Sequence, residues 1–154
     1  MLLSSANGTL FYPNISSPST MPFSLHPTLK KDCIELGRLA LCRVLLMNDS
    51  QFPWLILVPE RETIKEIHQL SDDDQQLLMC ESCYVAKKLA EHYQADKMNI
   101  ATLGNRVPQL HIHHVVRYQK DKAWPEPIWG KFDVLPYTEQ GLEITISQLR
   151  KLLL

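Results

Sequence analysis

The chain has 154 residues, of which 45% are hydrophobic, and a formal net charge of −1 at pH 7. This length is typical of one domain, and the hydrophobic content suffices for one core, which excludes wholesale disorder. The nearly balanced charge argues against a nucleic-acid-binding or anionic-membrane-binding surface, and no apolar run approaches the ~18 residues of a transmembrane helix.

The first twenty residues differ from the rest in composition. Residues 1–20 are rich in Ser, Asn, Pro and Thr, and they lack the basic start and uninterrupted apolar stretch of a signal peptide. We expect a loosely ordered extension over 1–20, followed by one domain over 21–154.

The first half of the chain predicts a helix, a strand pair and a second, short helix. Pro27 suits the first turn of a helix from His26-Pro27 to Leu36, and Gly37 suits its C-terminal end. A strand over 39–47 should pair with one over 52–58 across a turn at 48–50. A short helix is expected over 63–70.

The second half predicts a long helix, two strands and a final helix. Ser71 and three following Asp residues mark the start of the long helix, where Ser71 and Asp74 approximate a capping box. Apolar residues then recur at helical spacing and should face the core, namely Leu78, Val85, Leu89 and Tyr93. Strands over 98–102 and 109–118 and an amphipathic helix over 139–153 follow.

The four cysteines include a C-x-x-C pair inside the long helix. No second C-x-x-C follows Cys80 and Cys83, so a zinc or redox motif is not indicated. We expect both to be small buried residues on one helical face. Such cysteine usage is typical of a reduced, cytoplasmic protein.

Three of the six histidines fall within four residues, inside the last predicted strand. Because side chains alternate along a strand, Gln109, His111 and His113 should share one face. Two imidazoles and an amide pack poorly in a core, so this face is a candidate reactive surface. His114 points the other way, and we expect a structural histidine that bonds a backbone carbonyl.

This face allows three readings from its spacing alone. A neutral His can attack an electrophile covalently while a second His handles the leaving-group proton. Alternatively, His111 and His113 can ligate zinc with a further ligand from elsewhere. The third reading is a hydrated, exposed strand without chemistry.

The surrounding sequence resembles the histidine-triad (HIT) superfamily of nucleotide hydrolases and transferases, in particular a small bacterial branch. The family motif is His-φ-His-φ-His-φ-φ, with φ apolar, and this chain has Gln109-Leu110-His111-Ile112-His113-His114-Val115, then Val116 and Arg117. The resemblance covers roughly 22–130. It extends to the strand pair at 45–49 and 54–59, the strand and loop at 98–105, and the segment 123–130.

The motif departs from the family at two positions. Gln109 replaces the first His, and His114 occupies an apolar position. A register that starts at His111 would instead make His113 the middle residue. The spacing from His113 to Arg117 favours the first register, in which His111 is the middle residue.

The strand and helix pattern predicts an α+β fold with an antiparallel sheet carrying helices on one face. The resemblance implies a HIT-like sheet of five strands in a two-fold homodimer. It also implies that His111 attacks the α-phosphorus of a nucleoside phosphate derivative and forms a nucleotidyl-histidine intermediate. A backbone carbonyl would hold the other ring nitrogen, His113 would lie beside the phosphate or leaving group, and the Gln109 amide would donate to phosphate.

Further residues are implied as nucleotide contacts, namely Asn48, Asp49, Trp54, Asn99, Asn105 and Arg106. Asn48 or Asp49 would accept from ribose hydroxyls, although an Asx turn is an equal alternative. Asn99 and Asn105 would contact phosphates or the leaving group, and turn formation competes at Asn105. Arg106 would add positive charge or simply be solvated.

Trp54 would pack against the base or close the edge of the core. The stiff aromatic segment with Trp124 and Trp129 is expected to form a lid or dimer contact, with plain hydrophobic packing as the rival.

The expected partners are a purine nucleotide or another nucleoside phosphate derivative and a second copy of the chain. No cofactor, metal, nucleic acid or membrane is expected. Because Gln109 interrupts the triad, a catalytically weak nucleotide-binding relative is the main alternative. A zinc-binding protein that uses the His pair is the lesser one.

Overall fold

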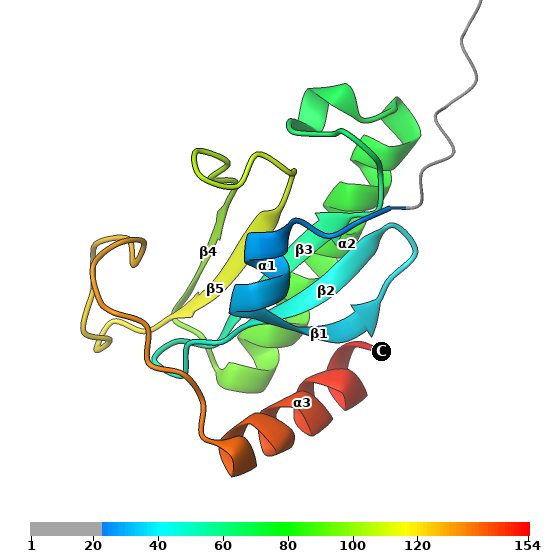
Figure 1. Cartoon of the computed structure of the whole chain (residues 1–154). Coiled ribbons are helices and arrows are strands. Elements are labelled where there is room, and N and C mark those ends of the chain that lie inside the picture. The colour runs from blue at the N-terminus through cyan, green and yellow to red at the C-terminus, as the bar shows by residue number, and fades with distance from the viewer. Residues whose placement is uncertain (1–22) are drawn as a thin grey trace, which may run out of the picture.

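The computed structural model describes residues 23–154, so the expected extension over 1–20 lies outside the described part of the chain. Its centre is a five-stranded sheet in the order β1-β2-β3-β5-β4, in which all neighbours pair antiparallel. This confirms the expected α+β fold with a five-stranded antiparallel sheet (Figure 1). The strands are β1 (Cys33–Arg38), β2 (Cys42–Met47), β3 (Trp54–Pro59), β4 (Lys97–Ala101) and β5 (Ile112–Arg117).

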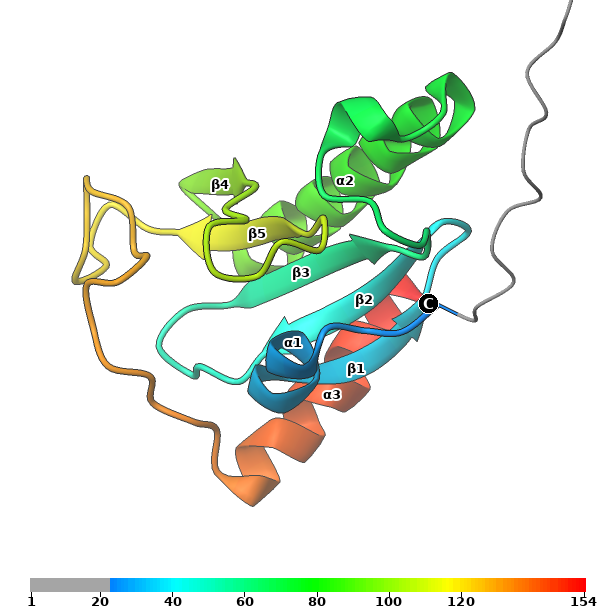
Figure 2. The same cartoon turned by 45° about the horizontal axis from the view of Figure 1, so that its top comes forward.

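The two long helices, α2 (Asp72–Tyr93) and α3 (Glu139–Leu153), cover one face of the sheet. The short α1 (Pro27–Asp32) lies on the opposite face, as both views show (Figures 1 and 2). The sheet therefore has apolar packing on both sides, whereas helices were expected on one face. The central strand β3 is buried along its whole length, which explains its continuous apolar sequence.

Side chains of β5 alternate between these two faces. Ile112 and Val116 belong to the core under α2 and α3, and Val115 belongs to the cluster on the α1 side. His114 lies on the same face as Ile112 and Val116, because its Nε2 lies 2.8 Å from Ser82 Oγ of α2. His113 lies on the same face as Val115. The two adjacent histidines therefore face opposite sides of the sheet, as the alternation predicts.

His114 is a structural histidine bonded to a carbonyl, as expected. Its Nδ1 lies 3.2 Å from the Ile112 carbonyl oxygen, which can only accept, so Nδ1 donates and Nε2 accepts from Ser82. Burial lowers the pKa of His114 to about 4, so the ring is neutral at pH 7.

The long helix begins where the sequence predicts. The Ser71 side chain accepts a hydrogen bond from the Asp74 backbone N–H at 3.2 Å, and three Asp residues occupy the first turn. In the predicted stripe, Leu78, Val85 and Leu89 are buried, and Tyr93 packs against the same core while partly exposed. The helix ends at Tyr93 and is capped by Gln94, which adopts a left-handed conformation with φ 51°.

The expected burial of Cys80 and Cys83 is wrong, because both are exposed on α2. Their polar neighbours Glu81 and Ser82 face the sheet instead. The Glu81 carboxylate accepts from the backbone N–H groups of Leu41, at 2.7 Å, and Cys42, at 3.0 Å. These hydrogen bonds compensate the burial of a charge, so the helix turns its polar residues inward and its thiols outward.

The first predicted helix is too long. It ends at Asp32, and Cys33–Arg38 forms edge strand β1, which gains a hydrogen-bonded ladder with β2. Gly37 lies in a bulge of that ladder rather than at a helix end, and a Cβ there would meet Leu154 Cδ1 at 2.4 Å.

Other boundaries also differ from the prediction. The short helix expected over 63–70 is a 3₁₀ turn, η1 (Ile67–Gln69). The strand expected from residue 39 begins at Cys42, because Leu39 N donates to the Cys42 carbonyl in the turn from β1. Within residues 23–154, no helix is both long and apolar enough to cross a membrane.

Candidate functional site

Two histidines meet at the start of β5. His113 is on the strand and His111 lies just before it, and their ring centroids are 4.9 Å apart at an interplanar angle of 73°. Both side chains are buried against the α1 side of the sheet. The predicted pairing of these two imidazoles on one face is therefore present in the structure.

A backbone carbonyl holds one nitrogen of His111. The Nδ1 atom lies 2.6 Å from the carbonyl oxygen of Gln109. Because a carbonyl only accepts, Nδ1 carries the proton and Nε2 presents a lone pair. Burial lowers the pKa of His111, although the bond to the Gln109 carbonyl opposes this shift. The ring is thus neutral at pH 7, with an unprotonated Nε2.

His113 is held in the opposite way. The indole Nε1 of Trp54 donates to its Nδ1 at 3.0 Å, and both side chains are buried. Burial lowers the pKa of His113 to about 3, and the neighbouring His111 and His114 contribute to the shift. His113 is therefore also neutral at pH 7.

Two cavities open on His111. The larger has a volume of about 530 Å³, and its walls are mainly apolar. Its lining includes Leu29, Met47, Trp54, Ile56, Leu103, Val107 and Trp129, with Asp32, Asn105, Arg106 and both histidines as polar groups. A flat, largely apolar ring system suits such walls, while the histidines supply reactive polar atoms.

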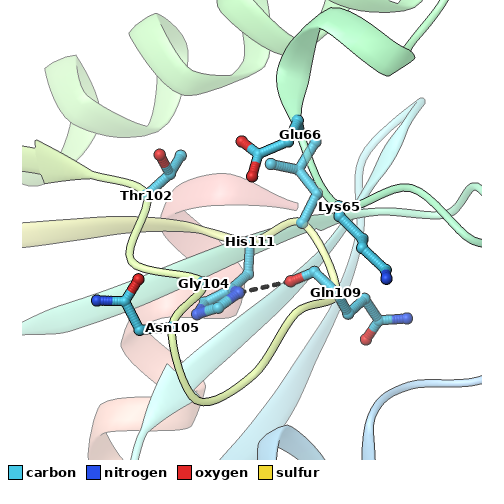
Figure 3. A pocket seen from close by; sticks show the side chains of 8 residues that line it. Lys65, Glu66, Thr102, Gly104, Asn105, Gln109 and His111 are labelled. Carbon is cyan, nitrogen blue, oxygen red and sulfur yellow. Dashed lines mark hydrogen bonds between the residues drawn. The ribbon is translucent and has the colours of Figure 1, made fainter.

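The smaller cavity, about 200 Å³, is mostly polar. Figure 3 shows that it lies between the segment with Lys65 and Glu66 and the loop with Thr102, Gly104 and Asn105. His111 and Asn105 contribute to both cavities, so the His111 ring stands at their junction.

Gln109 does not share the face of the two histidines, contrary to the expected alternation. The strand begins only at Ile112, so residue 109 precedes the regular alternation. The Gln109 amide points away from the His111 ring (Figure 3). Its Oε1 accepts from the His26 backbone N–H at 2.8 Å, and its Nε2 donates to the Ser24 carbonyl at 2.9 Å. The side chain thus anchors the segment before α1, while the backbone carbonyl contacts His111.

Three other predicted contact residues line the cavities. Asn105 lines both, and Arg106 and Trp54 line the larger one. Trp54 also belongs to the apolar cluster on that face, so it both closes the core edge and forms a cavity wall. Three of the six predicted nucleotide contacts therefore line the larger cavity.

The strand-end residues Asn48 and Asp49 make hydrogen bonds within the fold. Asn48 Oδ1 accepts from the Tyr137 backbone N–H at 3.2 Å. Asp49 Oδ1 accepts from the Gln51 backbone N–H at 3.1 Å, which is the Asx turn considered as an alternative. Asp49 lines a separate cavity of about 240 Å³ beside Trp129.

Asn99 also lies outside both cavities that open on His111. Its Oδ1 accepts from a terminal nitrogen of Arg117 at 2.6 Å. The Arg117 guanidinium is fully buried and also bonds both carboxylate oxygens of Asp121, at 2.7 and 3.0 Å. The two hydrogen bonds hold the start of the loop that follows β5.

That loop supplies Trp129, which lines the larger cavity. Its segment was expected from the sequence to form a lid or a dimer contact, with plain packing as the rival. Trp129 makes edge contacts with Trp54 and His113, with centroid distances of 6.0 and 5.7 Å. Within residues 23–154, its indole nitrogen is the one buried side-chain polar atom that lacks a hydrogen-bond partner.

Three charged residues around the cavities were not predicted. Asp32 lies inside an over-long predicted helix, and Lys65 and Glu66 lie inside an expected short helix. None of these positions carries a motif, so no local signal distinguished them from solvated surface residues. Within the described residues, no three His, Cys, Asp or Glu side chains are grouped to hold a metal ion.

The chain was compared with known families and structures. A family model described as the HIT domain matches residues 29–120. A histidine triad protein from Marinobacter aquaeolei VT8 is 49% identical, with a TM-score of 0.84 over 86% of this chain and 97% of that chain. A histidine triad protein from Bradyrhizobium japonicum is 42% identical, with a TM-score of 0.84 over 87% and 100% of the two chains.

A histidine triad protein from Sinorhizobium meliloti 1021 is 41% identical, with a TM-score of 0.81 over 84% of this chain and 96% of that chain. No curated protein matches the sequence significantly. The family model spans more than half of the chain, and the identities with the three solved structures all exceed 40%. The chain therefore belongs to the HIT family, and its fold is that of histidine triad proteins.

Proposed function

We propose that this protein is a nucleotide hydrolase or nucleotidyl transferase that attacks the α-phosphate of a nucleoside phosphate derivative through His111. Membership of the HIT family supports a nucleotide-binding or hydrolase-type function in general. The observation that carries the specific proposal is the 2.6 Å bond between His111 Nδ1 and the Gln109 carbonyl, which leaves Nε2 as the nucleophilic atom at the junction of the two cavities.

The cavities suggest how the substrate lies. In this proposal, a purine base packs against the apolar walls formed by Trp54, Ile56 and Val107, and the α-phosphate lies at His111. The leaving group extends into the smaller, polar cavity, where the ammonium of Lys65 offsets its negative charge. In the same proposal, Asn105, which lines both cavities, donates to phosphate oxygens.

The test is a covalent adduct. Incubation with a nucleotide labelled at its α-phosphate should give a phosphoramidate on His111 that is labile to acid and stable to base. Tight nucleotide binding without any adduct or turnover would support the alternative, a catalytically weak nucleotide-binding protein. That alternative rests on Gln109, whose amide is engaged with Ser24 and His26 rather than with the histidines.

The pH dependence of turnover should follow the protonation of His111. Attack needs the neutral ring, and burial lowers the pKa of His111 below its ordinary value of 6.5. We therefore expect kcat/KM to stay constant from pH 8 down to about 6.5 and to fall at lower pH, approaching tenfold per pH unit. Initial rates on a substrate that does not titrate in this range would measure it. A decline that already begins above pH 7 would contradict a neutral His111 nucleophile.

We also propose that the protein is a two-fold homodimer, as the family resemblance implies. Strand β4 is an edge of the described sheet and presents an exposed Ile100. Light scattering should give a mass near twice 17.8 kDa.

An Ile100→Glu substitution should shift the protein to a monomer, whereas Ile144→Glu, at an equally exposed position of α3, should not. A wild-type monomer at micromolar concentration would contradict the dimer. Dissociation by Ile144→Glu alone would place the interface on α3.

A cytoplasmic location, where the four cysteines stay reduced, completes the proposal.

A further inference from the structure

The two histidines are held in opposite tautomers by neighbours of opposite hydrogen-bonding type. A carbonyl oxygen, which only accepts, faces Nδ1 of His111, whereas an indole N–H, which only donates, faces Nδ1 of His113. Neutral His111 therefore carries its proton on Nδ1, and neutral His113 carries its proton on Nε2. Within residues 23–154, neither Nε2 atom has a hydrogen-bond partner. Neither is fully buried, so both are accessible to a ligand.

We propose that Trp54 is a positioning residue that locks His113 as a neutral Nε2–H donor, so that the site stabilises a departing anion but cannot protonate a leaving group. This inference deepens the proposed function and rests on it. It predicts the substrate class: nucleoside phosphates whose leaving group departs as a stable oxyanion, such as a phosphate or a sulfate, in preference to those with an amine or alcohol leaving group.

The position of Trp54 follows from the register of β3 and β5. Ile56 is the direct partner of His113, and Trp54 pairs with Val115, two residues further along β5. Trp54 and His113 are thus diagonal neighbours on one face, within reach of a large aromatic side chain. Their ring centroids are 5.5 Å apart. The hydrogen bond is therefore set by the central part of the sheet rather than by a loop.

Protonation of His113 would place an Nδ1–H against the indole N–H. It would lose the hydrogen bond and leave a charge in a buried site. With a pKa of about 3, only roughly one ring in ten thousand is an imidazolium at pH 7. The titratable and charged groups around His113 are His111 and His114 beside it in sequence, Asp32 at the end of α1, Cys33 on β1, and Arg106 in the loop before β5. None of them bonds its ring.

The remaining polar groups do not replace the missing acid. The Gln109 amide does not titrate and is engaged with the segment before α1. Glu66 lines the smaller cavity as a carboxylate, which only accepts hydrogen bonds. Lys65 and Glu66 both line the smaller cavity, so their opposite charges offset each other there.

The reaction balances without proton transfer from His113. His111 Nε2 forms a bond to the α-phosphorus while the bond to the leaving oxygen breaks, and that oxygen keeps the electron pair. The nucleotidyl-imidazolium keeps its proton on Nδ1, which donates a hydrogen bond to the Gln109 carbonyl oxygen. Water then bonds to phosphorus, the electron pair of the P–N bond returns to Nε2, and the proton of water passes to solvent. An amine would have to leave as a far more basic anion, which this site disfavours.

Nitrogen NMR tests the lock in the wild-type protein without any substitution. Long-range ¹H–¹⁵N correlation spectra should show His113 as the Nε2–H tautomer, with no titration between pH 5 and 8. An Nδ1–H pattern, or an imidazolium at pH 7, would overturn the proposal.

The variant Trp54→Phe removes the donor, and Trp129→Phe is the matched control, because Trp129 touches the same ring without bonding it. In Trp54→Phe, the His113 pKa should rise and the Nε2–H preference should weaken. Trp129→Phe should keep the wild-type pattern. Identical spectra for the two variants would refute the role of Trp54.

Kinetics test the consequence for specificity. A dinucleoside polyphosphate and an alkyl phosphoramidate of the same nucleotide form a substrate pair that differs in the leaving group. We expect kcat/KM to favour the polyphosphate by about a hundredfold or more, and Trp54→Phe to narrow that ratio about tenfold relative to Trp129→Phe. A ratio near one in the wild type, or one unmoved by Trp54→Phe, would refute the specificity.

The failure of the proposed function would look different. In that case no substrate would label His111, while the wild-type NMR spectra would still show the His113 tautomer.

Discussion

His111→Ala is expected to abolish covalent labelling by an α-phosphate-labelled nucleotide and to lower turnover by about a thousandfold or more. The substitution removes the Nε2 atom at the junction of the two cavities. A second nucleophilic group in the larger cavity, the thiol of Cys33, cannot replace it. Burial raises the pKa of Cys33 to about 12, so the thiol stays protonated at pH 7. The amount of acid-labile adduct on the protein, located by peptide mapping, measures the result.

His113→Ala is the comparison for this variant. It should slow turnover but still permit labelling, because the proposed role of His113 is to donate a hydrogen bond rather than to attack. If His113→Ala abolished labelling and His111→Ala did not, the nucleophile would lie two residues further along the chain. If neither change mattered, covalent catalysis would be contradicted, and nucleotide binding alone would remain.

Asp121→Asn should lower the free energy of unfolding by about 3–5 kcal/mol, since it leaves the buried Arg117 guanidinium without its counter-charge. This is a large part of the ~5–15 kcal/mol that stabilises a typical domain. Asp121 also accepts from the backbone N–H groups of Ala123 and Trp124, both at 2.9 Å. The same carboxylate thus shapes the loop that carries Trp129 to the larger cavity, so weaker nucleotide binding should accompany the loss.

Urea unfolding measures the effect, and Glu91→Gln is its control. Glu91 forms an exposed pair with Lys87 at 3.9 Å, and its loss should cost less than about 1 kcal/mol. The hydrogen bonds to Arg117 lower the pKa of Asp121 to about 2. Its contribution should therefore be complete above pH 3.8 and decline as the pH falls towards 2. A change of less than 1 kcal/mol in Asp121→Asn would contradict this account.

Sequence patterns predicted the elements whose cause is local or periodic. Ser71 and the acidic turn after it located the start of α2, because capping is a local interaction. The alternation in β5 placed His113 and His114 on opposite faces, and the sequence motif indicated the family. The strands around the histidines were recognisable because their apolar runs are short and bounded by turns.

The errors arise where contacts between residues far apart in the sequence determine the local structure. Glu81 faces the sheet because it binds the backbone turn at Leu41 and Cys42, forty residues away, so Cys80 and Cys83 point to solvent. Residues 33–38 join the sheet because β2 is available as a partner, whereas their local pattern also suits a helix. The Gln109 side chain turns towards Ser24 and His26, which lie more than eighty residues earlier. No window of sequence contains these partners.

The opposite orientation of His113 and His114 sets a limit on how the chain can change in length. The loop between β4 and β5 can absorb an insertion or deletion, because its backbone is not bound to the two-residue period of a strand. One residue added inside β5, between Ile112 and His113, would exchange the two faces beyond that point. The histidine bonded to Ser82 and the one bonded to Trp54 would then swap environments, and both hydrogen bonds would break. The fold should therefore tolerate alterations in length at 102–106, although these would change the walls of both cavities, and should reject them within β5.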